Sequence, residues 1–409
     1  MTSSVYIAKN VYGGDGLGRL GDGRVAFVPG AWTGEHVRAE IVEEKKHFVK
    51  AKLVEILESS PDRLPEDKRP PAMPGMVYAG LDYRAECRAK EAQLKEFLDR
   101  ARIPFGEFRP FDPASASQLG YRNKVVYHFA RRGDGWAIGY RAEPSHEIVD
   151  VESDPLARPE INAKLPEIRR AVVTLLTTGP EAVRRDTERK GGVTVRWTKK
   201  TGVKWWIGDT PPGLVLKETT AGLDFEVPAD GFYQVNPEVG EMLAKTVVGE
   251  YEKGAFAAPD VVDLYCGVGV FGLCCLKNAS DRGCPMRLFG VESGRQAVDF
   301  ARRNAASQGA RDAKFFAWRV GQSLRRIPAG PGTTVVVDPP RGGLERGVAR
   351  WLAGSKTPRI IYVSCDPATL VRDLRELSAS YAAESVGWFN MFPRTARFET
   401  VVTLGRKNP

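Results

Sequence analysis

The stretch VVDLYCGVGVFGL, residues 261–273, combines an apolar strand, a glycine turn and the start of a helix. Gly267 and Gly269 lack side chains, so a ligand can approach the backbone of this turn closely. In open parallel sheets, such a turn lies at the carboxyl end of its strand, where the ligand crevice forms. The stretch therefore predicts a nucleotide-type ligand site, with a simple packing turn as the alternative.

Strands and helices alternate along the chain on both sides of this stretch. The predicted helices include 241–252 and 293–309, and the short apolar segments between helices have the length of buried strands. These segments are DVVDLYC (260–266), RLFGVE (287–292), TTVVVDPP (333–340) and RIIYVSC (359–365), and FETVVTL (398–404) adds a late strand that could run antiparallel. The alternation predicts an α/β fold with a doubly wound parallel sheet.

Polar residues at the predicted strand ends indicate which ligand the crevice takes. Glu292 ends the second strand, where a carboxylate can accept hydrogen bonds from both ribose hydroxyls of a nucleotide-like cofactor. Gly267, Gly269 and Gly272 have the G-x-G-x-x-G spacing that dinucleotide sites also use, and among nucleotide-type cofactors we favour S-adenosylmethionine over nicotinamide and flavin. Asp338 ends the next strand, and its carboxylate could orient a nucleobase or cap a helix. In GFYQVNP (231–237), amides and aromatic rings together could bind an unpaired base, although a structural role remains open.

A thiol stands where the last parallel strand meets an Asp-Pro turn, in RIIYVSCDPATLVRD (359–373). Pro367 ends the strand, so Cys365 lies at its carboxyl end, on the ligand side of the sheet. Cysteine is also one of the residue types most often buried as a space-filler. Position alone leaves a reactive and a packing role open for Cys365.

The amino-terminal part differs in pattern. Residues 1–59 have short apolar runs split by glycine-rich turns, with basic and aromatic residues interleaved, which predicts a small β module. Its faces could stack bases and track phosphates, or they could be solvated sheet surface. Residues 60–222 contain a proline-rich linker, a helix at 82–102 and two basic hairpins at 120–141 and 195–206.

Composition limits the class of protein. The chain has 409 residues, of which 42% are apolar, and a net charge of +9, which favours an anionic partner such as nucleic acid. The six cysteines form no CxxC pair and the four histidines are scattered, so we expect no metal site and reduced thiols. The start MTSSVYIAKN lacks the apolar region of a signal peptide, and no apolar run approaches membrane length. We expect a cytoplasmic monomer without membrane contact.

Taken together, the motifs GFYQVNP, DLYCGVGVFGL, VVVDPPRGG, YVSCDPATLVRDL and MFPRTARFETVVTL resemble those of S-adenosylmethionine-dependent RNA uracil-5-methyltransferases. GDGLGRLGDGRVAFVPGAWTGEHV and ILESSPDR resemble that family's TRAM RNA-binding domain. The resemblance covers nearly the whole chain. It implies a TRAM/OB-like β-barrel (1–59), a central α+β domain (60–222) and a Rossmann-like class I methyltransferase domain (223–409).

The resemblance also implies a role for each matching residue. Cys365 becomes the nucleophile that adds to C6 of uracil, and Glu399 becomes the base that removes the C5 proton. For Glu399, a structural ion pair with Arg394 or Arg397 is the alternative. The implied cofactor contacts are Gln234, Tyr265, Gly267, Gly269, Glu292 and Asp338, and the implied substrate contacts are Phe232, Asp338 and Arg341.

The reaction that this family resemblance implies is formation of 5-methyluridine in structured RNA, either rRNA or tRNA, with the glycine-turn sequence leaning towards 23S rRNA. Because the reacting atoms of a paired base are stacked away, the target uridine must be flipped out or unpaired. Two other functions stay open. An exocyclic-amine methyltransferase could use DPPR, but it leaves Cys365 and Glu399 without a role and expects an aromatic residue at Arg341. The second alternative is a non-catalytic RNA-binding or RNA-folding protein, which would show no methyltransferase activity.

Three departures from the family pattern stand out. Many members hold an iron–sulfur cluster with cysteines, but here MPGM (73–76) replaces the Cys-Gly-Gly-Cys stretch and Asp154 replaces a later ligand. Because a cluster needs thiolates, we expect none. Val270 stands where an asparagine is common, and Arg319 stands near the position of an acidic residue that often meets the adenine amine.

Overall fold

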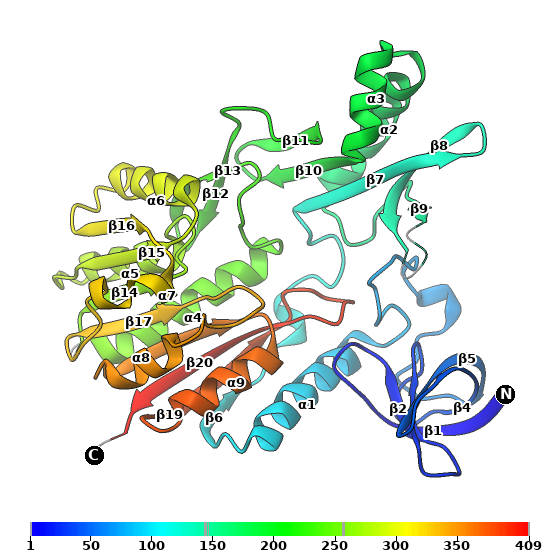
Figure 1. Cartoon of the computed structure of the whole chain (residues 1–409), viewed down its shortest axis with the longest axis horizontal. Helices are drawn as coiled ribbons and strands as arrows, with labels where there is room; N and C mark the ends of the chain where they lie inside the picture. Colours follow the sequence, from blue (N-terminus) through cyan, green and yellow to red (C-terminus); the bar gives the residue numbers. More distant parts are fainter. Residues whose placement is uncertain (1, 143–144, 146, 256–257, 408–409) are drawn as a thin grey trace.

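The computed structural model describes residues 2–142, 145, 147–255 and 258–407, and Figure 1 shows three regions around a central gap between ribbons. The amino-terminal region is a closed barrel with strand order β1-β2-β3-β5-β4. Its core consists of alternate strand residues such as Val5, Ile7 and Val37. Where β2 crosses β1, a Cβ on Gly18 would lie 2.3 Å from the carbonyl oxygen of Tyr6, so only glycine fits. The predicted β-barrel is confirmed. Its strands are β1 (Thr2–Asn10), β2 (Gly16–Arg19), β3 (Val25–Val28), β4 (His36–Glu44) and β5 (Phe48–Glu58).

The carboxyl-terminal region is built on an eight-stranded sheet with the order β16-β15-β14-β17-β18-β20-β19-β6. The four predicted parallel strands are confirmed as β14, β15, β17 and β18, and a fifth strand that was not predicted from the sequence, β16, pairs in parallel with β15. β14, β17 and β18 are almost continuously buried, as both faces of a parallel sheet are covered, whereas in the edge strand β16 only Phe315 is buried. β20 runs antiparallel between β18 and β19. The strands are β14 (Asp260–Leu264), β15 (Leu288–Glu292), β16 (Ala313–Ala317), β17 (Thr333–Val337), β18 (Arg359–Ser364), β19 (Tyr381–Phe389) and β20 (Glu399–Arg406).

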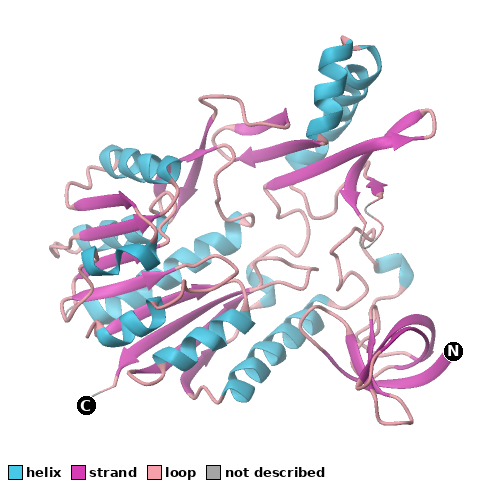
Figure 2. Ribbon diagram, viewed as in Figure 1, coloured by secondary structure: helices cyan, strands magenta, loops and turns pink. Residues whose placement is uncertain are grey.

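Helices cover both faces of this sheet. In Figure 1, α8 and α9 lie in front of the strands, while α4 lies behind them and packs against β17, β18 and β20. Figure 2 shows the same layers of helix, sheet and helix. The helices of this region are α4 (Pro237–Ala255), α5 (Val270–Asp281), α6 (Arg295–Ser307), α7 (Val320–Ser323), η3 (Leu324–Arg326), α8 (Val348–Gly354) and α9 (Pro367–Leu377).

Two elements from the amino-terminal half join the carboxyl-terminal sheet. Helix α1 (Tyr83–Ala101), capped by the Asp82 carboxylate, packs against α9, and β6 (Phe105–Arg109) pairs in parallel with β19 as the edge strand. The segment predicted as linker and central domain thus supplies part of the sheet. The proposed boundary at 222 falls in the turn between β12 (Val215–Thr220) and β13 (Leu223–Pro228), two paired strands. The domain boundaries themselves stay predictions.

The central region is a five-stranded sheet with the order β11-β10-β7-β8-β9, backed by two helices. Both predicted basic hairpins are present, as β7–β8 and β10–β11. Its core lies between the sheet and α2, around Tyr127, Ile161 and Val193. The elements are β7 (Lys124–Arg132), β8 (Gly135–Arg141), β9 (Ile148–Asp150), α2 (Pro159–Thr178), α3 (Glu181–Lys190), β10 (Gly192–Thr198) and β11 (Gly202–Ile207), with short turns η1 (Glu66–Lys68) and η2 (Pro113–Ser115) nearby. None of the described helices has the length and apolar character needed to span a bilayer.

Candidate active site

The glycine turn after β14 lies against the acidic end of β15, as the sequence predicted. Tyr265, Gly267 and Gly269 all have positive φ, and the tight turn delivers the chain into α5. Oε2 of Glu292 accepts a 3.4 Å hydrogen bond from the N–H of Gly267, and its Oε1 accepts one of 2.7 Å from Gly294. The carboxylate therefore holds the turn in shape while it remains partly exposed at the sheet edge.

A cleft beside this turn brings together five of the predicted residues: Phe232, Gln234, Tyr265, Gly267 and Asp338. It encloses about 650 Å³ of empty space, part of it open to solvent. The side chain of Phe232 is 72% exposed at the rim, so it is free to stack on a base. Gly269, Glu292, Arg341, Cys365 and Glu399 do not line the cleft itself.

The two amides of GFYQVNP have different positions. Gln234 lines the cleft, whereas Asn236 is fully buried and its Oδ1 accepts a 3.3 Å hydrogen bond from the N–H of Val239 at the start of α4. Of the two amides, Gln234 is therefore the one at the cleft, and the contacts of Asn236 Oδ1 fit the structural alternative. The Asn236 side chain fixes the start of the helix that follows.

Asp338 connects the cleft to the predicted catalytic pair. It follows β17 directly, and burial raises the pKa of its carboxyl to about 7. Its charge also acts on both Cys365 and Glu399, since it contributes to the raised pKa of each group. Asp263, one strand away in β14, has a pKa raised to about 7 by burial, and its Oδ2 accepts a 3.0 Å hydrogen bond from Gly272.

Cys365 directly follows β18, and Glu399 is the first residue of β20, the neighbouring strand, so both lie at the same end of the sheet. The antiparallel register of β18 and β20 ends with Ser364 opposite Thr400, one residue before Cys365 and one residue after Glu399. The thiol is partly exposed, while the Glu399 side chain is 4% exposed.

Electrostatics set the resting protonation of this pair. Burial raises the pKa of the Cys365 thiol to about 12, with the Glu399 charge as the next cause. Burial also raises the pKa of Glu399 well above its ordinary value, and Asp338 adds to the effect. Arg341 opposes both shifts, because its positive charge favours the ionised form of each group. The Arg341 side chain is exposed. The backbone carbonyl oxygen of Arg341 accepts a hydrogen bond from the Thr369 hydroxyl of α9.

Neither arginine that we considered as a structural partner of Glu399 pairs with it among the described residues. Arg394 is buried, donates to the carbonyl oxygen of Leu81 at 2.5 Å and lies 3.7 Å from Glu86. Arg397 lies 3.2 Å from Asp366. The ion-pair alternative for Glu399 is therefore wrong, and the carboxyl group is left beside the thiol.

Sequence reasoning missed two residues of this region. Glu218 in β12 lines the cleft, and Tyr12 of the barrel hydrogen-bonds to Asp366, the residue after Cys365. The sequence contained an indication of Glu218. In the strand VLKETT, Leu216, Glu218 and Thr220 share one face, so the Glu218 carboxylate lies on the buried side of the strand, where apolar side chains are usual. Tyr12 lies in a glycine-rich turn and gives no such signal.

The residues that replace the expected cysteines form ordinary packing contacts. Met76 is buried with Tyr121 and Leu156, and Met73 packs against the same cluster. Asp154 is buried, and its Oδ2 accepts a 2.5 Å hydrogen bond from the Tyr140 hydroxyl. Within residues 2–142, 145, 147–255 and 258–407, no group of three or more His, Cys, Asp or Glu side chains is arranged to hold a metal ion.

The structure also shows the contacts of the other two departures from the family pattern, Val270 and Arg319. Val270 lines the cleft at the first residue of α5, so it contributes apolar surface there. Arg319 lies 3.8 Å from Glu345 at the protein surface. Trp318 stacks on Phe316 at 4.4 Å between ring centroids, next to the end of β16.

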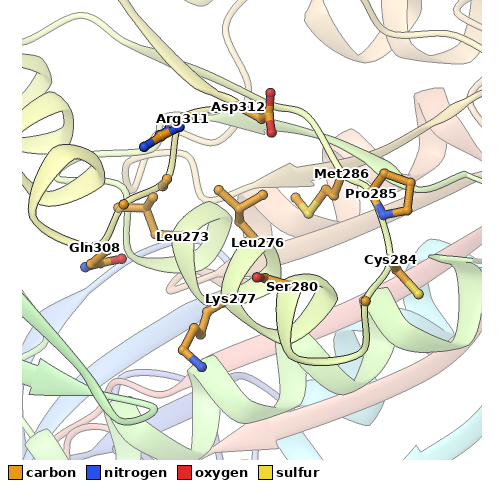
Figure 3. A pocket seen from close by; sticks show the side chains of 13 residues that line it. Leu273, Leu276, Lys277, Ser280, Cys284, Pro285, Met286, Gln308, Arg311 and Asp312 are labelled. Carbon is orange, nitrogen blue, oxygen red and sulfur yellow. The ribbon is translucent and has the colours of Figure 1, made fainter.

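A second hollow lies at the opposite, amino end of the parallel strands, between α5 and the loops that lead into β15 and β16 (Figure 3). It is lined by residues such as Lys277, Met286 and Arg311, and Figure 3 shows their side chains around a wide opening. None of the predicted site residues lines it. Because ligands of such sheets bind at the carboxyl ends of the strands, the cleft beside Asp338 is the functional candidate.

The cleft fits S-adenosylmethionine on its own geometry. Gly267 leaves open space where a Cβ would stand, which allows close approach to the turn. The Oε1 atom of Glu218 is buried in the cleft wall without a hydrogen-bond partner among the described residues, so an acceptor is left for a ligand donor. Glu292, at the end of the neighbouring strand, suits ribose hydroxyls.

Comparisons with known proteins agree with this geometry. Residues 330–407 match the family model for tRNA (Uracil-5-)-methyltransferase, and residues 5–54 match the TRAM domain. An uncharacterized RNA methyltransferase of Thermosynechococcus vestitus is 29% identical over 443 residues, covering 96% of this chain and 95% of that protein. Another, of Gloeobacter violaceus, is 29% identical over 463 residues, covering 99% and 96%.

A solved structure shows the same fold. The Pyrococcus abyssi tRNA (uracil-54, C5)-methyltransferase, crystallised with S-adenosyl-L-homocysteine, superimposes with a TM-score of 0.72 at 24% identity, covering 98% of this chain and 99% of that one. The sheet, cleft and barrel therefore define an S-adenosylmethionine-dependent class I methyltransferase with an appended TRAM domain. More specifically, residues 330–407 and 5–54 are similar to the tRNA (Uracil-5-)-methyltransferase and TRAM families, and the full-length relatives are RNA methyltransferases.

Proposed function

We propose that this protein methylates C5 of a uridine in rRNA or tRNA, with Cys365 as the nucleophile and Glu399 as the base. The observation that carries the proposal is the electrostatic effect of Glu399, the first residue of β20, on Cys365, which directly follows the neighbouring strand β18. Asp338, which acts electrostatically on both groups, also lines the cofactor cleft. These positions support a reaction in which the Cys365 thiol, the Glu399 carboxyl group and the methyl donor act at one end of the sheet.

In the proposed reaction, Cys365 and Glu399 each perform one chemical step. S-Adenosylmethionine, when bound, supplies an electrophilic methyl group. The Cys365 thiol loses its proton to solvent, and the thiolate Sγ forms a bond to C6 of uracil while the electrons of the C5–C6 double bond move onto the ring carbonyl as an enolate, which makes C5 nucleophilic. Once C5 carries the methyl group, Glu399, ionised beside the positive charge of Arg341, takes the C5 proton. The released electron pair restores the double bond and expels Sγ.

Substrate entry follows from the exposed groups around the pair. The Phe232 ring at the cleft rim would stack on a flipped uracil, and Arg341 would meet the base or its phosphate. The basic hairpins and the barrel would bind the surrounding RNA. The sequence favours 23S rRNA, whereas the structural relative is named for a tRNA substrate. Both RNAs therefore have to be tested. A monomeric state and a cytoplasmic location are part of the same proposal.

A trapping experiment tests the proposal. RNA with 5-fluorouridine at the target should form a stable adduct with the protein when cofactor is present, because fluorine cannot leave as a proton does. Transcripts of 23S rRNA segments and of tRNA are compared, and digestion with mass spectrometry locates the adduct on Cys365. Cys365→Ala should form none, and Cys284→Ala, which changes an exposed thiol far from the cleft, should react normally. Methyl transfer to RNA without any trapped species would favour the exocyclic-amine alternative.

A further inference from the structure

Glu218 is a buried carboxylate that the proposed mechanism does not use. Its side chain belongs to β12, where Leu216, Glu218 and Thr220 face inward and the residues between them are exposed. Glu218 is 6% exposed and lines the cleft together with Gln234 and residues of the glycine turn. A carboxylate in such a position costs free energy unless a donor meets it.

The protein itself offers Glu218 only a distant cation. Nη2 of Arg196 lies 3.8 Å from Oε1 of Glu218, too far for a hydrogen bond. Nη1 of Arg196 is engaged with the carbonyl oxygens of Ala229 and Gly231, at 2.9 and 3.0 Å, in the loop that leads to Phe232. Burial accordingly raises the pKa of Glu218 to about 7, although Arg196 opposes the shift. An acceptor inside the cleft is therefore available to a ligand.

Donors for an anion lie in the same cleft. Helix α5 begins at Val270 without a side-chain cap, and both Val270 and Phe271 line the cleft. The first N–H groups of a helix carry partial positive charge and suit a carboxylate. The cleft thus offers an acceptor, Glu218, and donors for an anion, which is the pattern that an α-amino acid zwitterion requires.

We propose that Glu218 binds the α-ammonium group of the methionine part of S-adenosylmethionine. The inference rests on the cofactor assignment and not on the uracil chemistry. Glu292, the residue suited to the ribose hydroxyls, contacts Gly267 but does not line the cleft. If the ribose lies at Glu292, the amino-acid end of the cofactor is the part that enters the cleft. The Glu218 carboxylate would then gain a charge-assisted hydrogen bond and a neutralising charge together.

Calorimetry with two ligands tests this contact on the full-length protein without RNA. The ligands are S-adenosylhomocysteine and its analogue in which hydrogen replaces the α-ammonium group. Wild type should prefer the first by roughly 10- to 100-fold, the range for a charge-assisted hydrogen bond. Glu218→Gln should reduce that preference to within about threefold, since the ammonium then meets an uncharged amide.

A matched control lies on the partner strand. Glu226→Gln changes a carboxylate that pairs with Arg303 and does not line the cleft, so it should keep the wild-type preference. An undiminished preference in Glu218→Gln would overturn the contact. No binding of S-adenosylhomocysteine to wild type would instead overturn the cofactor assignment, so the two failures are distinguishable.

A second measurement needs no variant, in case Glu218→Gln does not fold. A carboxyl group with a pKa near 7 is partly protonated at pH 7 and must lose its proton to pair with an ammonium group. Binding of S-adenosylhomocysteine at pH 7 should therefore release more protons than binding of the analogue, as titrations in two buffers of different ionisation enthalpy report. Equal proton release with both ligands would contradict the proposal.

Discussion

The hydroxyl of Tyr12, in the barrel, donates a 3.4 Å hydrogen bond to Oδ2 of Asp366, the residue that follows Cys365. Arg397 joins the contact, with its Nη1 2.9 Å from the Tyr12 hydroxyl and 3.2 Å from Asp366. The other oxygen of Asp366 accepts hydrogen bonds from Ala368 and Thr369 and so caps α9. The barrel therefore supports the loop that carries Cys365.

Tyr12→Phe should lower turnover by about three- to tenfold, because the loop after Cys365 loses one hydrogen bond to a charged group. Affinity for S-adenosylhomocysteine should stay unchanged, since Tyr12 does not line the cleft. The comparison measures single-turnover methylation and calorimetric binding. Tyr6→Phe, which changes an exposed barrel tyrosine, is the control and should behave like wild type. Equal turnover in all three proteins would show that the contact has no part in catalysis.

Glu399→Gln should bind RNA and let Cys365 add to the base, but it should not complete the reaction. Without a base for the C5 proton, the double bond cannot re-form and Sγ cannot leave, so turnover should fall by roughly 10² or more. Denaturing gels should show a covalent protein–RNA species on ordinary uridine RNA.

Glu376→Gln, which changes an exposed glutamate of α9, is the control for the stalled variant. The Gln side chain keeps the shape of Glu399, and that carboxyl has no ion-pair partner in the described part of the chain, so the variant should remain folded. Normal turnover by Glu399→Gln would remove the carboxyl group from the mechanism.

Arg341→Gln should slow alkylation of Cys365 by iodoacetamide in the RNA-free protein. The thiol has a pKa raised to about 12, so below pH 10 only a small fraction is thiolate, and the rate should rise with pH. Removing the Arg341 charge raises that pKa further, so the rate at pH 9 should fall by about two- to fivefold at low salt. Because Arg341 is exposed, the difference should narrow in 1 M salt.

The control for this measurement is Arg346→Gln, an exposed arginine on the same loop that does not act on Cys365. Peptide mass spectrometry must follow Cys365 alone, since Cys284 is exposed and will react as well. A faster reaction in Arg341→Gln than in wild type would reverse the sign we assign to this arginine.

Protein purified under anaerobic conditions should contain no stoichiometric iron and show no broad visible absorbance. Met73, Met76 and Asp154 stand where thiolates would be needed, and thioether or carboxylate groups do not replace the cysteine ligands of such clusters. Elemental analysis measures the iron content directly. About four irons per chain would contradict this prediction.

Four strands of the parallel sheet could be predicted from the sequence because they are short apolar runs with helices of regular period between them, whereas β16, with Lys314 exposed at the edge of the sheet, was not predicted. Asp338, Cys365 and Glu292 could be placed for the same reason, since each directly follows or ends a strand whose carboxyl end faces the crevice. The local sequence pattern was therefore sufficient to place a residue whose position in the site depends only on the strand that it ends or follows.

The remaining features depend on contacts between distant parts of the chain. FGEFR (105–109) has no marked apolar alternation and becomes a strand only because β19 offers it an edge. Tyr12 and Asp366 are brought together by the packing of the barrel on the catalytic region, which no local spacing encodes. Arg394 was a plausible partner of Glu399 by proximity in sequence, yet it turns to Glu86 of α1.

The pairing of β6 with β19 has a consequence for biosynthesis. The ribosome releases β6 early, whereas its only strand partner in the described sheet, β19, emerges near the end of the chain. At about 5–20 residues per second, β6 must wait on the order of tens of seconds with its backbone unpaired, as must the apolar face of α1. During that interval the barrel and the central region can fold, but the edge strand remains open to mispairing. Translation pauses or chaperone availability would then affect the yield of this protein through β6 more than through any other strand.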